Sequence, residues 1–349
     1  MQRFIKTFRG ELLAVPGRLI VFCFFVSLFF IPLVVTSPHT LSIFIMVNIY
    51  VIFAVSWDFL AGFAGQLSFG HAAFFGIAAY ISALVNIHFG LPPAAAIILG
   101  AIGGAIMGLV MGLPAMRIRG IYLALITLIF PLILDGFVFI FPDYTGGELG
   151  LCGISPLSHS INLSYYILLL CTLGSILLMW KLTDTKSSFV RTGVVLRGIQ
   201  EDEIAARAVG INTSLYKLWA FAISGFFAGL SGALYVHVMG VIGPSTLELL
   251  TSFNPIIWTI FGGMGTIYGP VVGVYCLYWL GEAFFAFMPE IRMLVFAIVV
   301  LLVIFFMPQG IAVWIRDKIE KECPRCKLNN FAGRGYCRAC GVSLHPEKR

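Results

Sequence analysis

The sequence predicts an all-α, polytopic membrane protein with about ten transmembrane helices and a small zinc ribbon at its C-terminal end. Of the 349 residues, 60% are hydrophobic and only 11% are charged, whereas soluble domains carry roughly 25% charged residues. Long apolar segments alternate with short polar loops, and two Cys-x-x-Cys pairs lie near the end of the chain. These observations divide the chain into a membrane domain, residues 1–315, and a tail, residues 316–349.

Apolar segments long enough to cross a membrane, or nearly so, recur along the first 310 residues, because a span needs about 20 mostly apolar residues. They lie near residues 19–36, 41–60, 67–88, 93–113, 120–141, 164–181, 216–238, 251–265, 268–287 and 290–310. The first follows a basic N-terminus without a small-residue cleavage site, so we expect an uncleaved span. The eighth is short and ends in a glycine cluster, which predicts a half-helix.

Lys and Arg residues gather in loops that would lie on one side of the membrane. They fall before the first predicted span, at Arg117 and Arg119, between Lys181 and Lys217, and after the tenth span. The loops on the opposite side contain no Lys or Arg. Since cytoplasmic loops carry an excess of these residues, we predict a multi-pass protein of the inner membrane with both termini in the cytoplasm.

Glycine and polar residues interrupt the apolar pattern in GFAGQLSFGH, residues 62–71. Non-helical backbone at membrane depth is tolerated only where it is buried in protein or lines a water-filled cavity. A second glycine-rich segment near residues 262–269 repeats the Gly-x-x-Gly spacing, and paired breaks mark the transport path in repeat-built carriers. We therefore predict a translocation path lined by Gly62, Gly65, Gln66, Ser68, Gly70, His71, Gly262 and Gly265. A packing role for His71, hydrogen-bonded to a neighbouring carbonyl, is an equal alternative.

Three acidic residues lie in or near the predicted spans. We expect Asp58 to lie at the inner interface in contact with water, and Asp135 and Glu282 to face the interior of the bundle. They form no helix-spaced acidic relay, which argues against a proton pump.

The loop of about residues 182–215 leaves the membrane on the predicted cytoplasmic side. Residues 200–209 favour one amphipathic helix with Gly210 as its stop. Its acidic first turn, Glu201 to Glu203, is unfavourable on an anionic lipid surface. The loop therefore favours contact with a protein partner.

The segment EIAARAVG, residues 203–210, resembles the Glu-Ala-Ala…Gly loop of ABC importer permeases. With GFAGQLSFGHAAFFGIAAY and GGMGTIYGPVVG in the same order, roughly residues 40–315 resemble the LivM-type permeases of branched-chain amino acid transporters, the LivH/LivM family. The resemblance implies a coupling helix that docks on an ATPase and contains Glu201, Asp202, Glu203, Ala205, Ala206 and Gly210. It further implies a paralogous permease subunit, two ABC ATPase subunits and an extracytoplasmic substrate-binding protein.

The function that this resemblance implies is import of amino acids, with Leu, Ile and Val as the expected substrates. A urea or short-chain amide permease and a stand-alone ion-coupled carrier stay open as alternatives. The sequence has no P-loop, His-Glu-x-x-His or Gly-x-Ser-x-Gly motif. We therefore predict no catalytic residues, and expect ATP hydrolysis in a separate subunit.

The tail contains Cys323, Cys326, Cys337 and Cys340, with ten residues between the two pairs. This spacing is typical of a structural Zn²⁺ site with four thiolates. Two disulfides are the alternative, but disulfides are rare in a reducing cytoplasm. Most of the net charge of +6 belongs to this tail, which suits contact with anionic membrane lipid and gives no reason to expect nucleic acid as a partner. The resemblance does not account for the tail, which we interpret as a regulatory or docking module.

Overall fold

The computed structural model describes residues 16–35, 37–184, 192–287, 297–298, 300–302, 305–307, 309–326, 329–331, 333–337 and 340–343. In this part of the chain, six helices are long and apolar enough to cross a membrane. They are Pro38–Phe63, His71–Phe89, Pro93–Ala115, Ile121–Ile140, Ile161–Thr183 and Thr213–Met239. The second to seventh predicted spans are thereby confirmed. The tenth, at 290–310, lies largely outside the described residues.

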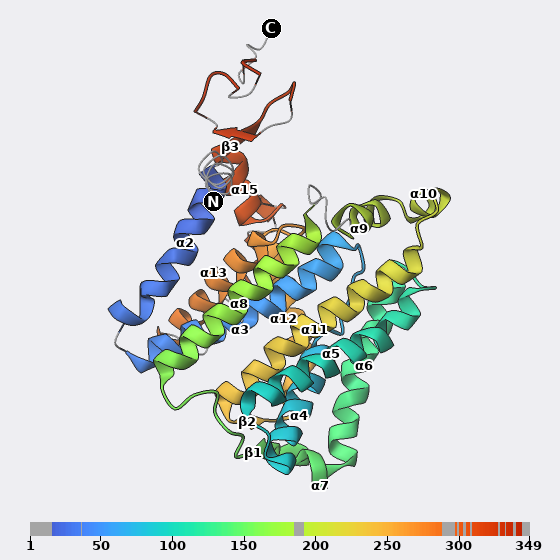
Figure 1. The fold of residues 1–349 in the computed structure, drawn as a ribbon, viewed down its shortest axis with the longest axis vertical. Helices are drawn as coiled ribbons and strands as arrows, with labels where there is room; N and C mark the ends of the chain where they lie inside the picture. Colours follow the sequence, from blue (N-terminus) through green and yellow to red (C-terminus); the bar gives the residue numbers. More distant parts are fainter. Residues whose placement is uncertain are drawn as a thin grey trace, which may run out of the picture.

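The helices form one bundle of long, inclined rods (Figure 1). Its elements are α2 (Pro16–Val34), α3 (Pro38–Asp58) continued by the π-helix η1 (Phe59–Phe63), α4 (His71–Phe89), α5 (Pro93–Ala115), α6 (Ile121–Ile140), α8 (Ile161–Thr183), α11 (Thr213–Met239), α12 (Leu249–Gly262) and α13 (Tyr268–Phe287). The helices α2, α12 and α13 coincide with the first, eighth and ninth predicted spans. With 14 residues, α12 has the half-helix length expected from the glycines that follow it.

The centre of the bundle is α3, which contacts α8, α11, α12 and α13. In the helix Pro38–Phe63, 89% of the most hydrophobic 18-residue stretch is buried. A helix with this composition belongs in a protein interior. By contrast, only 28% of the corresponding 18-residue stretch of α6 is buried. Most of the surface of α6 is therefore not covered by the rest of the single chain.

Small residues hold α5 against α11. A Cβ atom on Gly104 would collide with the carbonyl oxygen of Gly225, and one on Gly225 would collide with that of Gly104. The backbones are therefore in direct contact, as small residues spaced by four permit in membranes. This close pair is the scaffold against which α4 packs.

The connections divide between two ends of the bundle (Figure 1). At one end lie α7 (Pro142–Thr145), the 3₁₀ turns η2 (Gly147–Leu149) and η3 (Pro244–Thr246), and the two-residue strands β1 (Leu151–Cys152) and β2 (Val241–Ile242), which pair antiparallel. At the other end lie α9 (Thr192–Glu201), α10 (Glu203–Ala208), α15 (Ile311–Ile319) and the antiparallel hairpin of β3 (Glu320–Glu322) and β4 (Asn329–Phe331). The segments that carry Arg119, Arg207 and Lys217 lie together at this second end.

Candidate functional site: a glycine junction, a charged loop and a cysteine cluster

The two glycine-rich breaks meet in space. The backbone N–H of Gly265, in the turn between α12 and α13, donates to Asp58 Oδ1 at 2.7 Å. A Cβ atom on Gly62, in η1, would lie 2.6 Å from the Gly265 nitrogen. Gly265 itself has a φ of +76°, a conformation that favours glycine. The spacing that linked the two segments in the sequence therefore corresponds to a real contact, the glycine junction.

Asp58 does not lie in water, which corrects the expectation from its position at the end of a span. Its side chain is fully buried, because the turn after α12 covers it. Within the described residues, its second oxygen, Oδ2, has no hydrogen-bond partner. No local pattern around Asp58 indicates this burial, since the covering turn lies 207 residues away.

His71 begins α4 at the edge of the junction and is fully buried. Its Nε2 lies 3.0 Å from the hydroxyl of Ser56 and 3.5 Å from that of Ser224. The rings of Phe53 and Phe74 contact the imidazole. The partners are thus hydroxyl groups of α3 and α11 rather than the neighbouring carbonyl of the packing alternative.

Most of the other predicted path residues in the first segment are buried. Ser68 and Gln66 are buried, and the Ser68 carbonyl accepts a hydrogen bond from the Trp57 indole at 2.8 Å. Gly70 is pressed against the backbone of Thr127. Gly65 is exposed. A path through this junction therefore requires a rearrangement of the helices that meet here.

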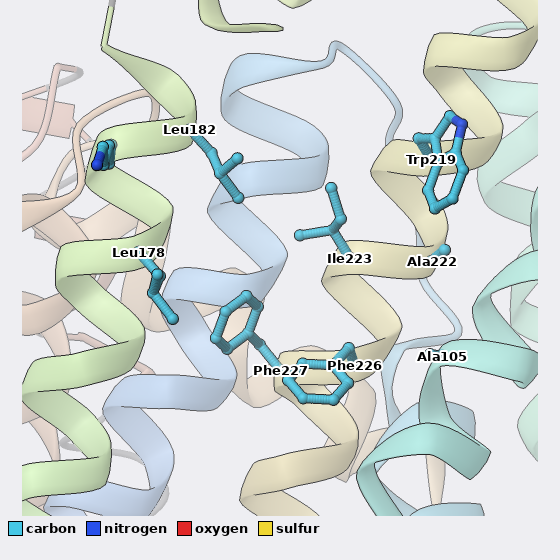
Figure 2. A pocket seen from close by; sticks show the side chains of 9 residues that line it. Ala105, Leu178, Leu182, Trp219, Ala222, Ile223, Phe226 and Phe227 are labelled. Carbon is cyan, nitrogen blue, oxygen red and sulfur yellow. The ribbon is translucent and has the colours of Figure 1, made fainter. Parts of the chain in front are cut away.

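One apolar groove lies away from the junction. It has a volume of ≈ 490 Å³ and faces outward between α8 and α11 (Figure 2). Its lining consists of Ala105, Leu178, Lys181, Leu182, Trp219, Ala222, Ile223, Phe226 and Phe227. Such an apolar surface suits lipid chains rather than an amino acid's charged groups.

The loop between α8 and α11 contains two short helices instead of the single helix predicted for residues 200–209. The chain breaks at Asp202, whose carboxylate accepts from the backbone N–H groups of Ile204 and Ala205 at 2.8 and 3.1 Å. Asp202 is therefore the N-cap of α10, and Glu201 ends α9. Gly210 follows α10 with a φ of +86° and donates to the Arg207 carbonyl, which confirms it as the stop.

Glu203 is the centre of an ionic cluster that ties α10 to the bundle. Its carboxylate contacts Lys217 Nζ at 2.6 Å, Arg207 at 2.7 Å and Arg119 at 2.9 Å. The side chain of Lys217 is only 1% exposed and that of Glu203 only 9%. The hydroxyl of Thr213 also donates to Glu203 at 3.1 Å.

These partners keep Glu203 ionised. Burial by itself would raise the pKa of this carboxyl, but hydrogen bonds from Lys217 and Thr213 and the charges of Lys217 and Arg119 outweigh it and lower the pKa below its ordinary value. Arg119 lies 84 positions earlier in the chain, so sequence reasoning missed the cluster.

The outer face of α10 is apolar. Ile204 is 71% exposed and Val209 76%, and Ala205 is exposed beside them. Ala206 instead packs inward, as Glu203 does. Of the residues predicted to form the coupling helix, Ala205 thus lies on an outward apolar surface with Ile204 and Val209, whereas Glu203 is an inward charged anchor.

The four tail cysteines come together. Their sulfur atoms all lie within 4.8 Å of one another, with Cys323 Sγ 3.4 Å from Cys340 Sγ and Cys326 Sγ 3.5 Å from Cys337 Sγ. Hydrogen bonds from the backbone N–H groups of Cys326 and Arg325 lower the pKa of the Cys323 thiol. Cys323 and Cys326 lie between β3 and β4, and Cys337 and Cys340 follow β4. The cluster built on this hairpin can hold a metal ion.

The fold and these sites define a multi-pass membrane protein with a charged, surface-presented loop between two spans. Comparison with known proteins narrows this class. A family model described as "Branched-chain amino acid transport system / permease component" matches residues 39–304. The chain belongs to this family.

Individual relatives agree. The high-affinity branched-chain amino acid transport system permease protein LivM of Escherichia coli is 27% identical, across 86% of this chain and 74% of its own length. LivM of Salmonella typhimurium is 26% identical, across 83% and 74%. A shorter match joins 35% of this chain to the autoinducer 2 import system permease protein LsrC of Yersinia enterocolitica, at 30% identity.

Proposed function

We propose that this protein is the membrane permease subunit of an ATP-driven importer that moves Leu, Ile and Val into the cytoplasm. The observation that carries the proposal is the match to branched-chain amino acid permeases over nearly the whole membrane domain. The similarity to autoinducer 2 permeases covers about a third of the chain, which is weaker support for other substrates. The family consists of transport subunits, so hydrolysis of ATP belongs to another chain.

The expected partners are a paralogous permease subunit, two ATPase subunits and an extracytoplasmic binding protein. The end of the bundle with α9, α10 and α15 also holds Arg119, Arg207 and Lys217, which supports a cytoplasmic orientation. The opposite end, with β1, β2 and α7, then faces the binding protein. Both termini are cytoplasmic in this arrangement.

The glycine junction supports the path predicted from sequence in a closed state. Two breaks that contact through Gly62, Gly265 and Asp58 form a joint where α3, α4, α12 and α13 can shift relative to one another. Gly262 and Gly70 allow backbone contact on either side of it.

The cysteine cluster is best explained as a structural zinc site. Four sulfurs about 2.3 Å from a tetrahedral Zn²⁺ stand roughly 3.8 Å apart, and the two closest pairs here are 3.4 and 3.5 Å apart. The Asn330 amide lies 3.5 Å from Cys337 Sγ and can orient this thiolate. Four protein ligands fill the coordination shell, so the ion would be structural.

The apolar face of α10 provides the test of coupling to an ATPase. We expect Ile204→Asp to weaken co-purification of the ATPase subunits at least tenfold, because it places a charge in an apolar contact. Leu149→Asp is the matched control, since Leu149 is 91% exposed at the opposite end of the bundle. Pull-down of the ATPase with the tagged permease measures the effect. Unchanged capture by a normally inserted Ile204→Asp protein would favour a stand-alone carrier.

A further inference from the structure

An acidic side chain with one unsatisfied oxygen lies on α6, which has the smallest buried share of the six candidate membrane spans. This residue is Asp135 of α6, a helix in which only 28% of the most hydrophobic 18-residue stretch is buried. The expectation that Asp135 faces the bundle interior is therefore only partly met, since its side chain is half-buried on an otherwise open helix. Its Oδ1 atom is buried without a hydrogen-bond partner in the described structure. A carboxylate at membrane depth is costly unless a cation or water meets it.

A second unsatisfied group lies on α4, the helix that packs against this part of α6. Tyr80 of α4 is only 6% exposed, and its hydroxyl also has no hydrogen-bond partner among the described residues. The carboxylate of Asp135 is close enough to act electrostatically on this hydroxyl. Two buried polar atoms without partners on contacting helices are unusual in a folded protein and call for a ligand.

Among the described residues of these two helices and of the neighbouring loops, none is a lysine or an arginine that could be that partner. Neither α4 nor α6 contains Lys or Arg, and the loops 89–92, 142–163 and 239–250 at this end contain none. The nearby His237 already contacts Ser82 and Ser155 through its two ring nitrogens. A cation that meets Asp135 would therefore come from outside the described residues.

The pair sits beside an aliphatic cluster near the β1–β2 end. Tyr80 belongs to the same buried cluster as Val138, Ile242 and Leu247. Asp135 is five residues before the end of α6, roughly 8 Å along the helix, so it lies in the outer third of the span. The carboxylate suits the ammonium group of a branched-chain amino acid, and the neighbouring aliphatic side chains suit its branched side chain.

We propose that Asp135 and Tyr80 bind the primary ammonium group of the substrate as it enters from the extracytoplasmic side. This inference rests on the proposed function. The ammonium would donate to the Asp135 carboxylate and to the Tyr80 oxygen, which satisfies both groups with charge-assisted hydrogen bonds. In apolar surroundings such a contact is stronger than in water. Asp135 then selects amino acids over analogues that lack the ammonium.

Carbodiimide labelling of Asp135 in the purified transporter complex tests the site. Dicyclohexylcarbodiimide adds to carboxyl groups at membrane depth, and peptide mass spectrometry reports each position separately. We expect leucine to slow labelling of Asp135 at least fivefold, while 4-methyl-2-oxopentanoate, which lacks the ammonium, and Na⁺ do not. Tyr80→Phe should raise the half-protecting leucine concentration about tenfold, because one charge-assisted hydrogen bond is lost. Glu148→Gln, in the exposed outer loop, should change nothing.

Equal protection by the oxo acid, protection by Na⁺ alone, or no protection would each overturn the site. An Asp135 that never reacts would do the same, because it would be covered by a partner subunit. Leucine uptake by the same wild-type preparation is measured in parallel. Uptake without protection refutes the site alone, whereas protection without uptake keeps the site and refutes the proposed function.

Discussion

Glu203→Gln should destabilise the end of the bundle that holds α9 and α10 by about 3 kcal/mol, because it leaves a buried lysine without its counter-ion. Lys217 is 1% exposed and contacts Glu203 at 2.6 Å. The purified variant should unfold at a lower temperature than the wild type. Adding Lys217→Met should recover part of this loss, since the unpaired charge is then removed as well.

The pH dependence has a definite sign. The pKa of Glu203 is lowered in the folded protein, so its stabilisation is present above the ordinary pKa of 4.5 and lost as the pH falls through the lower, folded value. The difference in unfolding temperature between wild type and Glu203→Gln should therefore shrink towards acid pH. Glu201→Gln is the matched control, because Glu201 is an exposed neighbour at the end of α9. An equal loss in both variants would contradict an anchoring role for Glu203.

Cys337→Ser should abolish metal binding by the tail and unfold the β3–β4 hairpin. Zinc contributes roughly 10–16 kcal/mol to the folding of small fingers, so the loss of one thiolate removes most of the tail's stability. Metal analysis should fall from one Zn²⁺ per chain to nearly none, and limited proteolysis should cut the tail. The helix bundle has its own core and should stay folded.

Cys276→Ser is the control, because Cys276 lies in α13, far along the chain from the cluster. It should retain one zinc per chain. A purified wild-type protein that contains no metal and four alkylatable tail thiols would contradict the zinc site. A different bound metal would keep the cluster but change its identity.

Local patterns in the sequence predicted the parts of the structure that depend on local physics. Apolar length marked six confirmed spans, and glycine after α12 marked its early end. The Cys-x-x-Cys spacing predicted a cluster that the structure brings within 4.8 Å. Each of these signals is contained within one span or one short motif.

The sequence failed where contacts join distant segments. Asp58 was predicted to contact water at the interface, but the turn at Gly265 covers it. One local signal was missed as well: propensity favoured a single helix over residues 200–209, but the Asp202 carboxylate caps a new helix start. The separate roles of Glu203, turned inward, and Ile204, turned outward, depend on Lys217 and on the packing of α10 against α11.

The central claim is that this chain is the permease of an ATP-driven importer of branched-chain amino acids. The most direct measurement is uptake of radiolabelled leucine into proteoliposomes that contain the purified complex, with its binding protein and with ATP on the ATPase side. We expect uptake that requires ATP and the binding protein, survives collapse of ion gradients, and is competed by isoleucine and valine but not by urea. Uptake driven by an ion gradient without ATP, or ATP-dependent uptake of urea in place of leucine, would contradict the claim.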